Sequence, residues 1–271
     1  MMKFKKQVLG TVVILAGVLL AGCANGGKNA TGKDTNYKSE LVKRGSLTIG
    51  LEGTFAPYSY RDNGKLTGFE VELGQDIAKK IGVKPVFVPT KWDSLIAGLG
   101  SGRYDVILNN INKTPQRAKV YAFADPYIYS RYVLISRSDE KGLKTLASIK
   151  GKKLVEGTGT DNFNVATKYG ATVVPNGDFP TALGLIRQDR VAATINSREA
   201  FLAYAKSNPT SDLKYVDLSK TLAPTAVQPM LNKQSPKLLA KVSAAIKELR
   251  QDGTLTKLSE KYFGSDITKA N

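Results

Sequence analysis

One arginine of the sequence stands where its side chain could bind an anionic ligand. The segment from Asn110 to Arg117 follows a strand-like stretch and ends in Thr-Pro-Gln-Arg. Thr114 is a favourable helix N-cap and Pro115 a favourable first helical residue, so we expect a helix to begin there with free backbone N–H groups that attract an anion. The guanidinium of Arg117 can grip a carboxylate through two hydrogen bonds. An arginine in the first turn opposes the helix dipole, which favours a binding role over a surface ion pair.

Three glutamates could bind the ammonium group of a zwitterionic ligand. Glu52 and Glu156 each close a strand-like segment, and Glu199 stands near the start of a helix. The helix dipole alone also favours an acid at such a position, so a structural role for Glu199 stays open. Phe55 and Trp92 could form aromatic walls of the same site, although Trp92 precedes an apolar helix and could equally pack in the core.

The composition excludes several classes of function. The chain holds no histidine and a single cysteine, which excludes Ser-His-Asp and Cys-His catalysis and zinc sites that use imidazole. There is no Gly-rich loop for nucleotide phosphates. A formal net charge of +17 attracts polyanions, but the lysines are scattered and no arginine-rich segment exists, so we expect no nucleic-acid partner. We also expect no metal and no cofactor.

The first 22 residues have the composition of an export signal. Lys3, Lys5 and Lys6 precede an apolar run over Val8–Ala21, whose 14 residues are fewer than the about 20 that a membrane-spanning helix needs. The run leads into Leu-Ala-Gly-Cys, which resembles a bacterial lipobox ending at Cys23. We therefore expect a lipidated (palmitate-carrying) Cys23 and a lipoprotein anchored on the extracellular face of the cell membrane, most readily in a Gram-positive bacterium.

The remainder of the chain alternates strands and helices after a polar stretch. Residues 23–45 are predicted to be a flexible tether because Ala24–Asn36 consists almost entirely of polar residues and glycine. The alternation is typical of α/β layers with mostly parallel sheets. The expected strands are 47–51, 86–88, 105–108, 153–155, 171–174 and 191–195, and the expected helices are 69–81, 94–99, 162–169, 181–187, 236–251 and 255–262.

The two halves of this pattern repeat one another. Glu-Gly-Thr closes the first strand of each half, at 52–54 and again at 156–158. A later strand of each half ends in an asparagine, Asn109 or Asn196, that follows an arginine by six residues. The repetition predicts two similar lobes whose strands end in polar residues. Ligands of open α/β sheets lie beyond the carboxyl ends of the strands, so we expect binding between the lobes.

Five ordered motifs resemble the polar-amino-acid solute-binding proteins of ABC importers. They are Glu52–Tyr58, Gly68–Leu73, Gly102–Val106, Thr114–Arg117 and Phe123–Tyr127. The resemblance covers about residues 40–264 and implies an α/β two-lobe fold of the periplasmic-binding-protein type, with a hinge and a ligand cleft between the lobes. It implies that lobe 1 comprises 46–131 and 226–271, and lobe 2 comprises 132–225.

Two further motifs, 91–99 and 196–200, are similar to those of lactobacillar cystine-binding lipoproteins, also described as basic surface or collagen-binding proteins. The resemblance implies that Arg117 binds the ligand α-carboxylate, assisted by asparagines and a Thr-Gly turn, and that Phe55 and Trp92 flank the ligand side chain. Many members have an aspartate for the ammonium where this chain has Ser197, so the ammonium partner stays open. The predicted ligand-binding set is Glu52, Phe55, Trp92, Asn110, Asn112, Arg117, Glu156, Thr158, Gly159, Ser197 and Glu199.

The favoured hypothesis is a monomeric binding protein that captures a polar amino acid, preferably cystine, and delivers it to the permease and ATPase of an ABC importer. A basic cell-surface adhesin for host matrix or cell-wall polymers is the second hypothesis. The third is a dehydratase-type enzyme on the same scaffold, in which a cleft glutamate would act as general acid or base.

Overall fold

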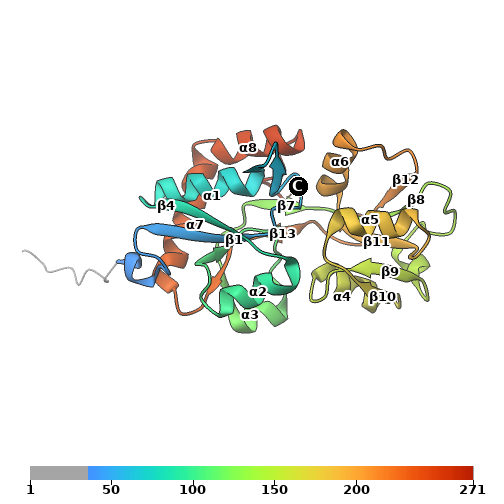
Figure 1. Cartoon of the computed structure of the whole chain (residues 1–271), viewed down its shortest axis with the longest axis horizontal. Helices are drawn as coiled ribbons and strands as arrows, with labels where there is room; N and C mark the ends of the chain where they lie inside the picture. Colours follow the sequence, from blue (N-terminus) through green and yellow to red (C-terminus); the bar gives the residue numbers. More distant parts are fainter. Residues whose placement is uncertain (1–35, 271) are drawn as a thin grey trace, which may run out of the picture. The chain divides into compact units, whose positions relative to one another are not determined.

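The computed structural model of the chain describes residues 36–270. Within this part, two five-stranded sheets with helices on both faces form two lobes, which are joined by a pair of crossing strands (Figure 1). The α/β two-lobe architecture predicted from the sequence is confirmed.

Lobe 1 is built on a sheet with the strand order β4-β1-β5-β14-β6. Its strands are β1 (Ser46–Leu51), β4 (Lys84–Pro89), β5 (Val106–Ile107), β6 (Tyr121–Phe123) and β14 (Met230–Asn232). Helices α1 (Phe69–Lys80), α7 (Pro236–Gln251) and α8 (Thr254–Phe263) cover one face, and α2 (Trp92–Gly100) and α3 (Pro115–Val120) cover the other. β1 is buried along its whole length between β4 and β5, which explains its mainly apolar sequence.

Helix α1 shows why these residues form their elements. Leu73 and Ile77 recur at helical spacing and are buried on the face that packs against the sheet. Gly82 follows the helix in the left-handed region, with φ of 73°, and ends it. Upstream of α1, the hairpin of β2 (Tyr60–Asp62) and β3 (Lys65–Thr67) turns through an Asn-Gly pair with positive φ at both residues.

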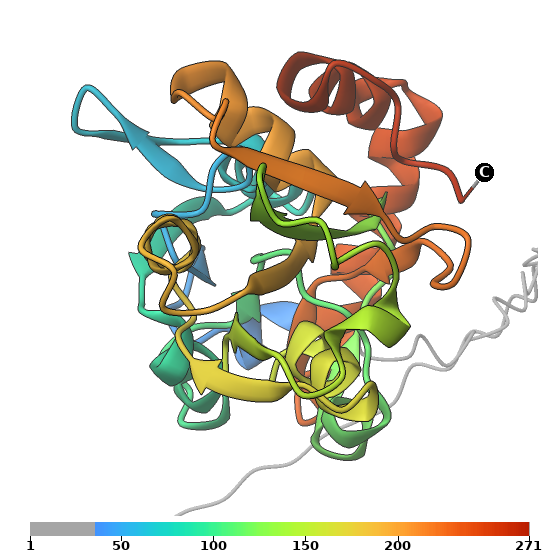
Figure 2. The same cartoon turned by 90° about the vertical axis from the view of Figure 1, so that its right-hand side faces the viewer.

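Lobe 2 repeats this plan with the strand order β10-β9-β11-β8-β12. Its strands are β8 (Tyr132–Arg137), β9 (Lys153–Glu156), β10 (Thr172–Pro175), β11 (Ala193–Ser197) and β12 (Leu213–Asp217). Helix α4 (Asp161–Lys168) covers one face, and α5 (Phe179–Arg187) and α6 (Arg198–Ser207) cover the other. Figure 2 views the molecule from the lobe 2 side, with β12 at the edge of this sheet.

The chain passes between the lobes on two short strands. β7 (Ile128–Ser130) and β13 (Thr225–Val227) pair antiparallel with each other and belong to neither large sheet. Lobe 2 is therefore one continuous stretch of chain, whereas lobe 1 is assembled from segments on both sides of it.

The prediction of mostly parallel sheets is only half right. In each lobe the first three strands of the order are parallel, and the other two pairings are antiparallel. Strands β6 and β14 are three residues long, too short to show a period in the sequence. β8 and β12 are longer, but the parallel strand–helix alternation does not include them.

The predicted tether differs from the structure over its last ten residues. Residues 37–40 form a 3-10 helix, and Tyr37 and Leu41 are buried in the core of lobe 1. The carboxylate of Glu40 accepts a hydrogen bond from the Leu238 backbone N–H at 2.7 Å, at the start of α7. These apolar side chains, four residues apart, anchor a stretch whose average composition is polar.

The predictions for the signal segment and for lipidated Cys23 lie outside residues 36–270. Among the helices that the structure describes, none combines the length and the apolar character required to cross a bilayer.

Candidate functional site

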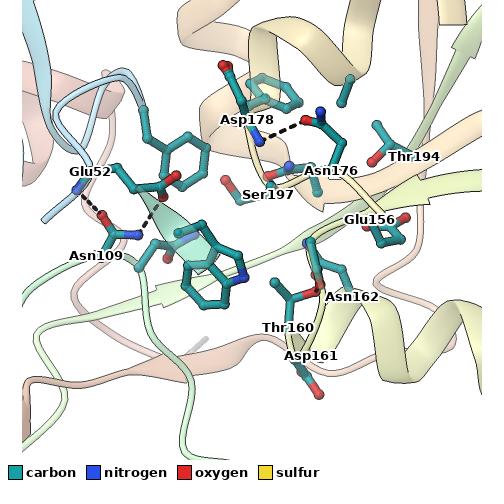
Figure 3. Close-up of a pocket in the computed structure, with 18 of the residues that line it drawn as sticks. Glu52, Asn109, Glu156, Thr160, Asp161, Asn162, Asn176, Asp178, Thr194 and Ser197 are labelled. Atoms are coloured by element: carbon teal, nitrogen blue, oxygen red, sulfur yellow. Dashed lines mark hydrogen bonds between the residues drawn. The ribbon is translucent and has the colours of Figure 1, made fainter. Parts of the chain in front are cut away.

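A cavity with a volume of about 90 Å³ lies where the two lobes face each other (Figure 3). Lobe 1 contributes residues that follow β1 and β5, and lobe 2 contributes residues that follow β9, β10 and β11, so the carboxyl ends of parallel strands meet there. The lining residues are Glu52, Phe55, Trp92, Asn109, Asn110, Asn112, Arg117, Ser130, Tyr132, Val155, Glu156, Gly157, Thr160, Asp161, Asn162, Asn176, Gly177, Asp178, Phe179, Ala182, Thr194, Asn196 and Ser197.

Arg117 lines this cavity from the first turn of α3. Thr114 caps the helix by accepting a hydrogen bond from the Arg117 backbone N–H at 3.2 Å, and Pro115 follows as the first helical residue, as predicted. The side chain is 8% exposed. Its Nη1 donates to the Asn112 carbonyl oxygen at 3.0 Å, and its Nη2 donates to the Gly159 carbonyl oxygen in lobe 2 at 2.9 Å. Burial lowers the pKa of Arg117, and the Asp161 carboxylate opposes that shift.

Asp161, at the start of α4, forms a polar group with residues of both lobes. Its Oδ2 accepts hydrogen bonds from the Tyr132 hydroxyl and from Asn112 Nδ2, the latter at 3.4 Å. Asn112 Nδ2 also donates to the Tyr132 hydroxyl at 3.2 Å. Burial, together with the Asp161 carboxylate, raises the pKa of Tyr132, so its hydroxyl keeps its proton. The group presents an acid close to the positive charge of Arg117.

A second polar group surrounds Glu52 at the end of β1. Asn109 clamps Glu52, because Nδ2 donates to the carboxylate at 2.7 Å and Oδ1 accepts from the Glu52 backbone N–H at 2.8 Å (Figure 3). Burial raises the pKa of Glu52 to about 7, with further contributions from Asp178 and Asp93. Asn176 Oδ1 accepts from the Asp178 backbone N–H at 3.0 Å in the facing loop of lobe 2. This end of the cavity is rich in acceptors.

Glu156 occupies the position in lobe 2 that Glu52 occupies in lobe 1. It is 3% exposed, and its Oε1 accepts from the Ile195 backbone N–H at 2.7 Å. Burial raises its pKa well above the ordinary value for a glutamate, so we expect a neutral acid that could donate a hydrogen bond. Asn196, from the repeated Arg-to-Asn pattern, lines the cavity as Asn109 does.

Trp92 connects the lobes beside Arg117. Its Nε1 donates to the Thr158 carbonyl oxygen at 2.9 Å, and the Arg117 guanidinium lies 5.6 Å from the indole centroid. A Cβ added at Gly157 or Gly177 would come within 3.2 or 2.9 Å of Trp92 atoms, so both glycines allow the indole to approach the lobe 2 backbone. Together with the Gly159 contact, this bond holds the lobes in a closed arrangement.

Four buried polar atoms of cavity residues have no hydrogen-bond partner in the part of the chain that the structure describes. Three are acceptors, Asn110 Oδ1, Asn112 Oδ1 and Asp178 Oδ2, and one is a donor, Arg117 Nε. Buried polar groups are nearly always paired in folded proteins, so such a set indicates a ligand that supplies the partners.

A wider groove with a volume of about 780 Å³ adjoins the cavity. The residues common to both are Glu52, Trp92, Asn176, Gly177 and Asp178. The groove is otherwise lined by residues of α2, of the end of β10, of α5 and of loops of both lobes: Thr54, Lys91, Asp93, Ile96, Thr158, Pro175 and Thr181. A ligand bound in the cavity therefore has a route past Glu52 toward charged residues.

Most of the predicted ligand-binding residues meet at the cavity. Eight of them line it: Glu52, Phe55, Trp92, Asn110, Asn112, Arg117, Glu156 and Ser197. Thr158 and Gly159 do not, and their carbonyl oxygens instead accept hydrogen bonds from Trp92 and Arg117. Ser197 Oγ caps α6 through the Ala200 backbone N–H at 3.1 Å and lies 3.1 Å from the Tyr58 hydroxyl.

The prediction that Glu199 contacts the ligand disagrees with the structure. Glu199 is 5% exposed and does not line the cavity. Its Oε2 accepts from Ser130 Oγ at 3.2 Å and from the Arg131 backbone N–H at 3.5 Å, where β7 enters lobe 2. The first turn of α6 directs this carboxylate toward the crossing strand. Glu199 therefore has a structural role, the alternative that its position at a helix start had left open.

Sequence reasoning missed several lining residues. Asn176, Asp178 and Phe179 follow β10, whose end has no counterpart in the repeated motifs. Asp161 gave no signal because an acid is common in the first turn of a helix such as α4. Tyr132 gave none because it is simply the first residue of a strand. A signal existed for Asn109 and Asn196, which the Arg-to-Asn spacing identified as strand ends. Among residues 36–270, no group of three or more acidic, histidine or cysteine residues could hold a metal ion.

Comparison with known proteins agrees with this geometry. The model of the bacterial extracellular solute-binding proteins, family 3, matches residues 47–265. The chain is 37% identical over 271 residues to the L-cystine-binding protein TcyA of Bacillus subtilis, covering 98% of this chain and 100% of TcyA.

Two solved structures are also similar. An ancestral arginine-binding protein bound to glutamine has a TM-score of 0.77 at 34% identity, covering 82% of this chain and 100% of that one. The L-cystine solute receptor of Neisseria gonorrhoeae in its unliganded open conformation has a TM-score of 0.58 at 38% identity, covering 86% and 99%. The chain thus superposes better on the ligand-bound relative despite its lower identity, as expected for closed lobes. All three relatives are binding proteins or receptors by name.

Proposed function

The chain belongs to the bacterial extracellular solute-binding proteins of family 3, as an amino-acid-binding protein of the ABC transporter class, and from this premise we propose that its ligand is L-cystine. The proposal includes capture between the two lobes outside the cell and delivery to a membrane permease.

One observation carries the amino-acid part of the proposal. The cavity combines a buried guanidinium with three buried acceptor atoms for which residues 36–270 supply no hydrogen-bond partner. A guanidinium complements an α-carboxylate, and carboxylate and amide oxygens complement an α-ammonium. An amino-acid zwitterion supplies both groups on one carbon atom.

The preference for cystine is supported by two polar groups around the cavity. One contains Asp161 near Arg117, and the other contains Glu52 near Asp178; Figure 3 shows Glu52 and Asp161 on different sides of the site. Cystine carries two zwitterionic heads linked by an apolar disulfide, so two separated polar groups suit it. The adjoining groove gives room for a ligand longer than one amino acid. Relatives named for cystine binding, at 37% and 38% identity, support the same choice.

Ligand capture would work through lobe closure. The ligand bridges Arg117 from lobe 1 and acceptors from both lobes, so it binds the closed form more tightly than the open form and shifts the population toward closure. The bonds from Arg117 to Gly159 and from Trp92 to Thr158 form only when the lobes meet. The closed surface is then the form that the permease would receive.

The anchoring part of the proposal rests on the sequence before residue 36. A diacylated Cys23 would hold the protein at the membrane and raise its concentration near the permease. Replacement of Cys23 by alanine is expected to release the protein into the medium; wild-type retention in the membrane fraction would contradict lipid anchoring.

A ligand panel tests the function. Thermal unfolding is measured with L-cystine, L-cysteine, L-arginine, L-glutamine and L-histidine, because a ligand at 100 times its Kd stabilises the native state by about 2.7 kcal/mol. Trp92 is the only tryptophan of the chain and lines the cavity, so its fluorescence reports binding directly. The largest response is expected for cystine. A larger response to another amino acid would refute the assignment of cystine but not amino-acid binding. If no amino acid of the panel gives a response, the proposed function is refuted.

A further inference from the structure

A buried acid lies behind the cavity without lining it. Glu70, the second residue of α1, is 0% exposed and is absent from the cavity lining. Its Oε1 accepts hydrogen bonds from the Asn110 backbone N–H at 2.6 Å and from the Tyr127 hydroxyl, whereas its Oε2 has no partner among the described residues.

Both partners of Glu70 stand at places that matter for binding. Asn110 lines the cavity and adopts a left-handed backbone with φ of 48°, which is uncommon for a residue other than glycine. Two residues later, the Asn112 carbonyl oxygen receives Arg117 Nη1. Tyr127 immediately precedes β7, and its backbone N–H donates to the Val227 carbonyl oxygen in β13 at 3.0 Å. One carboxyl oxygen thus connects the ligand-binding turn to the start of the crossing strands.

We propose that Glu70 is a positioning residue for ligand binding, which holds the turn at Asn110, and through it Arg117, in register with the crossing strand that begins after Tyr127. This inference rests on the proposed function of the cavity. Glu70 acts as a hydrogen-bond acceptor through Oε1 and needs no negative charge for this role.

The surroundings of Glu70 agree with a neutral acceptor. Burial raises its pKa to about 7, with a further contribution from the charge of Glu52, while the bonds from Tyr127 and Asn110 lower it. A proton on Oε2 would occupy the oxygen that lacks a partner, and glutamine would place its amide nitrogen there while keeping the acceptor oxygen.

The test compares Glu70→Ala, Glu70→Gln and the control Ile77→Ala. Ile77 is 1% exposed on the same helix, so its truncation destabilises lobe 1 without removing a contact of the turn. Affinity for L-cystine, and for whichever panel amino acid gives the strongest response, is measured by Trp92 fluorescence and calorimetry. Glu70→Ala leaves two buried donors, the Asn110 backbone N–H and the Tyr127 hydroxyl, without their acceptor. We therefore expect this variant to raise Kd by at least about tenfold.

The expected pattern separates positioning from loss of stability. Glu70→Gln should restore Kd to within about threefold of wild type, and Ile77→Ala should leave Kd unchanged at a temperature where the variant is folded. Wild-type affinity in Glu70→Ala, or equal weakening in Glu70→Ala and Glu70→Gln, overturns the proposal.

Amide hydrogen exchange of segment 108–112 tests the same contact without any ligand. Faster exchange is expected in Glu70→Ala and not in Ile77→Ala, and unchanged exchange in Glu70→Ala also overturns the proposal. If the wild-type protein binds no amino acid, the proposed function fails, while the exchange measurement still decides the role of Glu70.

Discussion

Replacement of Arg117 by alanine removes the contact on which binding and closure both depend. The ligand carboxylate loses its cationic partner, the Gly159 carbonyl oxygen loses a hydrogen bond from the other lobe, and the stacking on Trp92 disappears. Truncation of one partner of a buried charge pair costs about 2–5 kcal/mol. The variant also loses the bond from Arg117 to Gly159 in the other lobe, so we expect a loss of binding free energy in the upper part of that range. This is about 3–5 kcal/mol, or roughly 150- to 5,000-fold in Kd. Arg117→Lys keeps the charge but loses the planar fork, so we expect an intermediate loss.

Titration calorimetry with L-cystine, and with the best alternative amino acid of the panel, measures this loss. Arg187→Ala is the matched control, because Arg187 also stacks on an aromatic ring, Tyr204 at 5.7 Å, but lies outside the cavity and pairs with Asp212. We expect Arg187→Ala to bind as the wild type does. Wild-type affinity in Arg117→Ala, with calorimetry showing an unchanged enthalpy, would refute the assignment of the carboxylate site.

Two other predictions concern pH and lobe closure. The folded-state pKa values of Glu52 and Glu70 are raised from 4.5 to about 7, so the folded protein binds more protons than the unfolded chain in that range. Their contribution to the free energy of unfolding is full below about pH 4.5 and is lost as pH rises through about 7. Urea unfolding of Glu70→Gln should show a decrease in the free energy of unfolding between pH 5 and 8 that is smaller than in the wild type by on the order of 3 kcal/mol. An equal decrease in both proteins would count against a buried acid at position 70. Gly177→Ala brings a Cβ to 2.9 Å from Trp92 and should weaken cystine binding by about tenfold or more by obstructing closure. Gly184→Ala is the control, because its added Cβ meets no neighbouring group of residues 36–270 within 4 Å beyond its own helix, and it should leave Kd unchanged. Equal affinities of these two variants would show that the indole does not need the glycine.

Sequence patterns predicted those parts of the site that repeat or that begin a helix. Glu52 and Glu156 end corresponding strands of the two lobes, and Arg117 stands in a well-capped first turn, so local rules were sufficient to place them. Asp178 could not be found in this way, because it lies in the loop after β10, which the repeated motifs do not include. Glu199 stands in a first helical turn, where a binding residue could also stand. Its hydrogen bond from Ser130 of β7, which the local sequence does not reveal, shows that its carboxylate points toward the crossing strand.

The fold shows a similar division between local and long-range information. Helix α7 was predicted at its observed bounds, since its apolar residues keep a helical spacing over sixteen residues. Strands β7 and β13 carry only three residues each, and their identity as crossing strands comes from pairing across almost one hundred residues. Tyr37 and Leu41 were assigned to the tether because their packing partners lie in α7, near the other end of the chain.

The position of β14 bears on the order in which the chain can fold. All five strands of lobe 2 lie between residues 132 and 217, so that lobe has its complete sheet while the last fifth of the polypeptide is still to come. In lobe 1, β6 reaches the sheet only through β14, which begins at Met230. Until this late strand arrives, β5 and β6 have exposed edges and α1 lacks its two neighbouring helices. During synthesis, lobe 2 would therefore have its complete sheet while lobe 1 is still incomplete. Truncation before residue 230 would remove β14 and so disconnect β6, the strand that contacts the arginine-bearing helix α3, from the rest of the lobe 1 sheet.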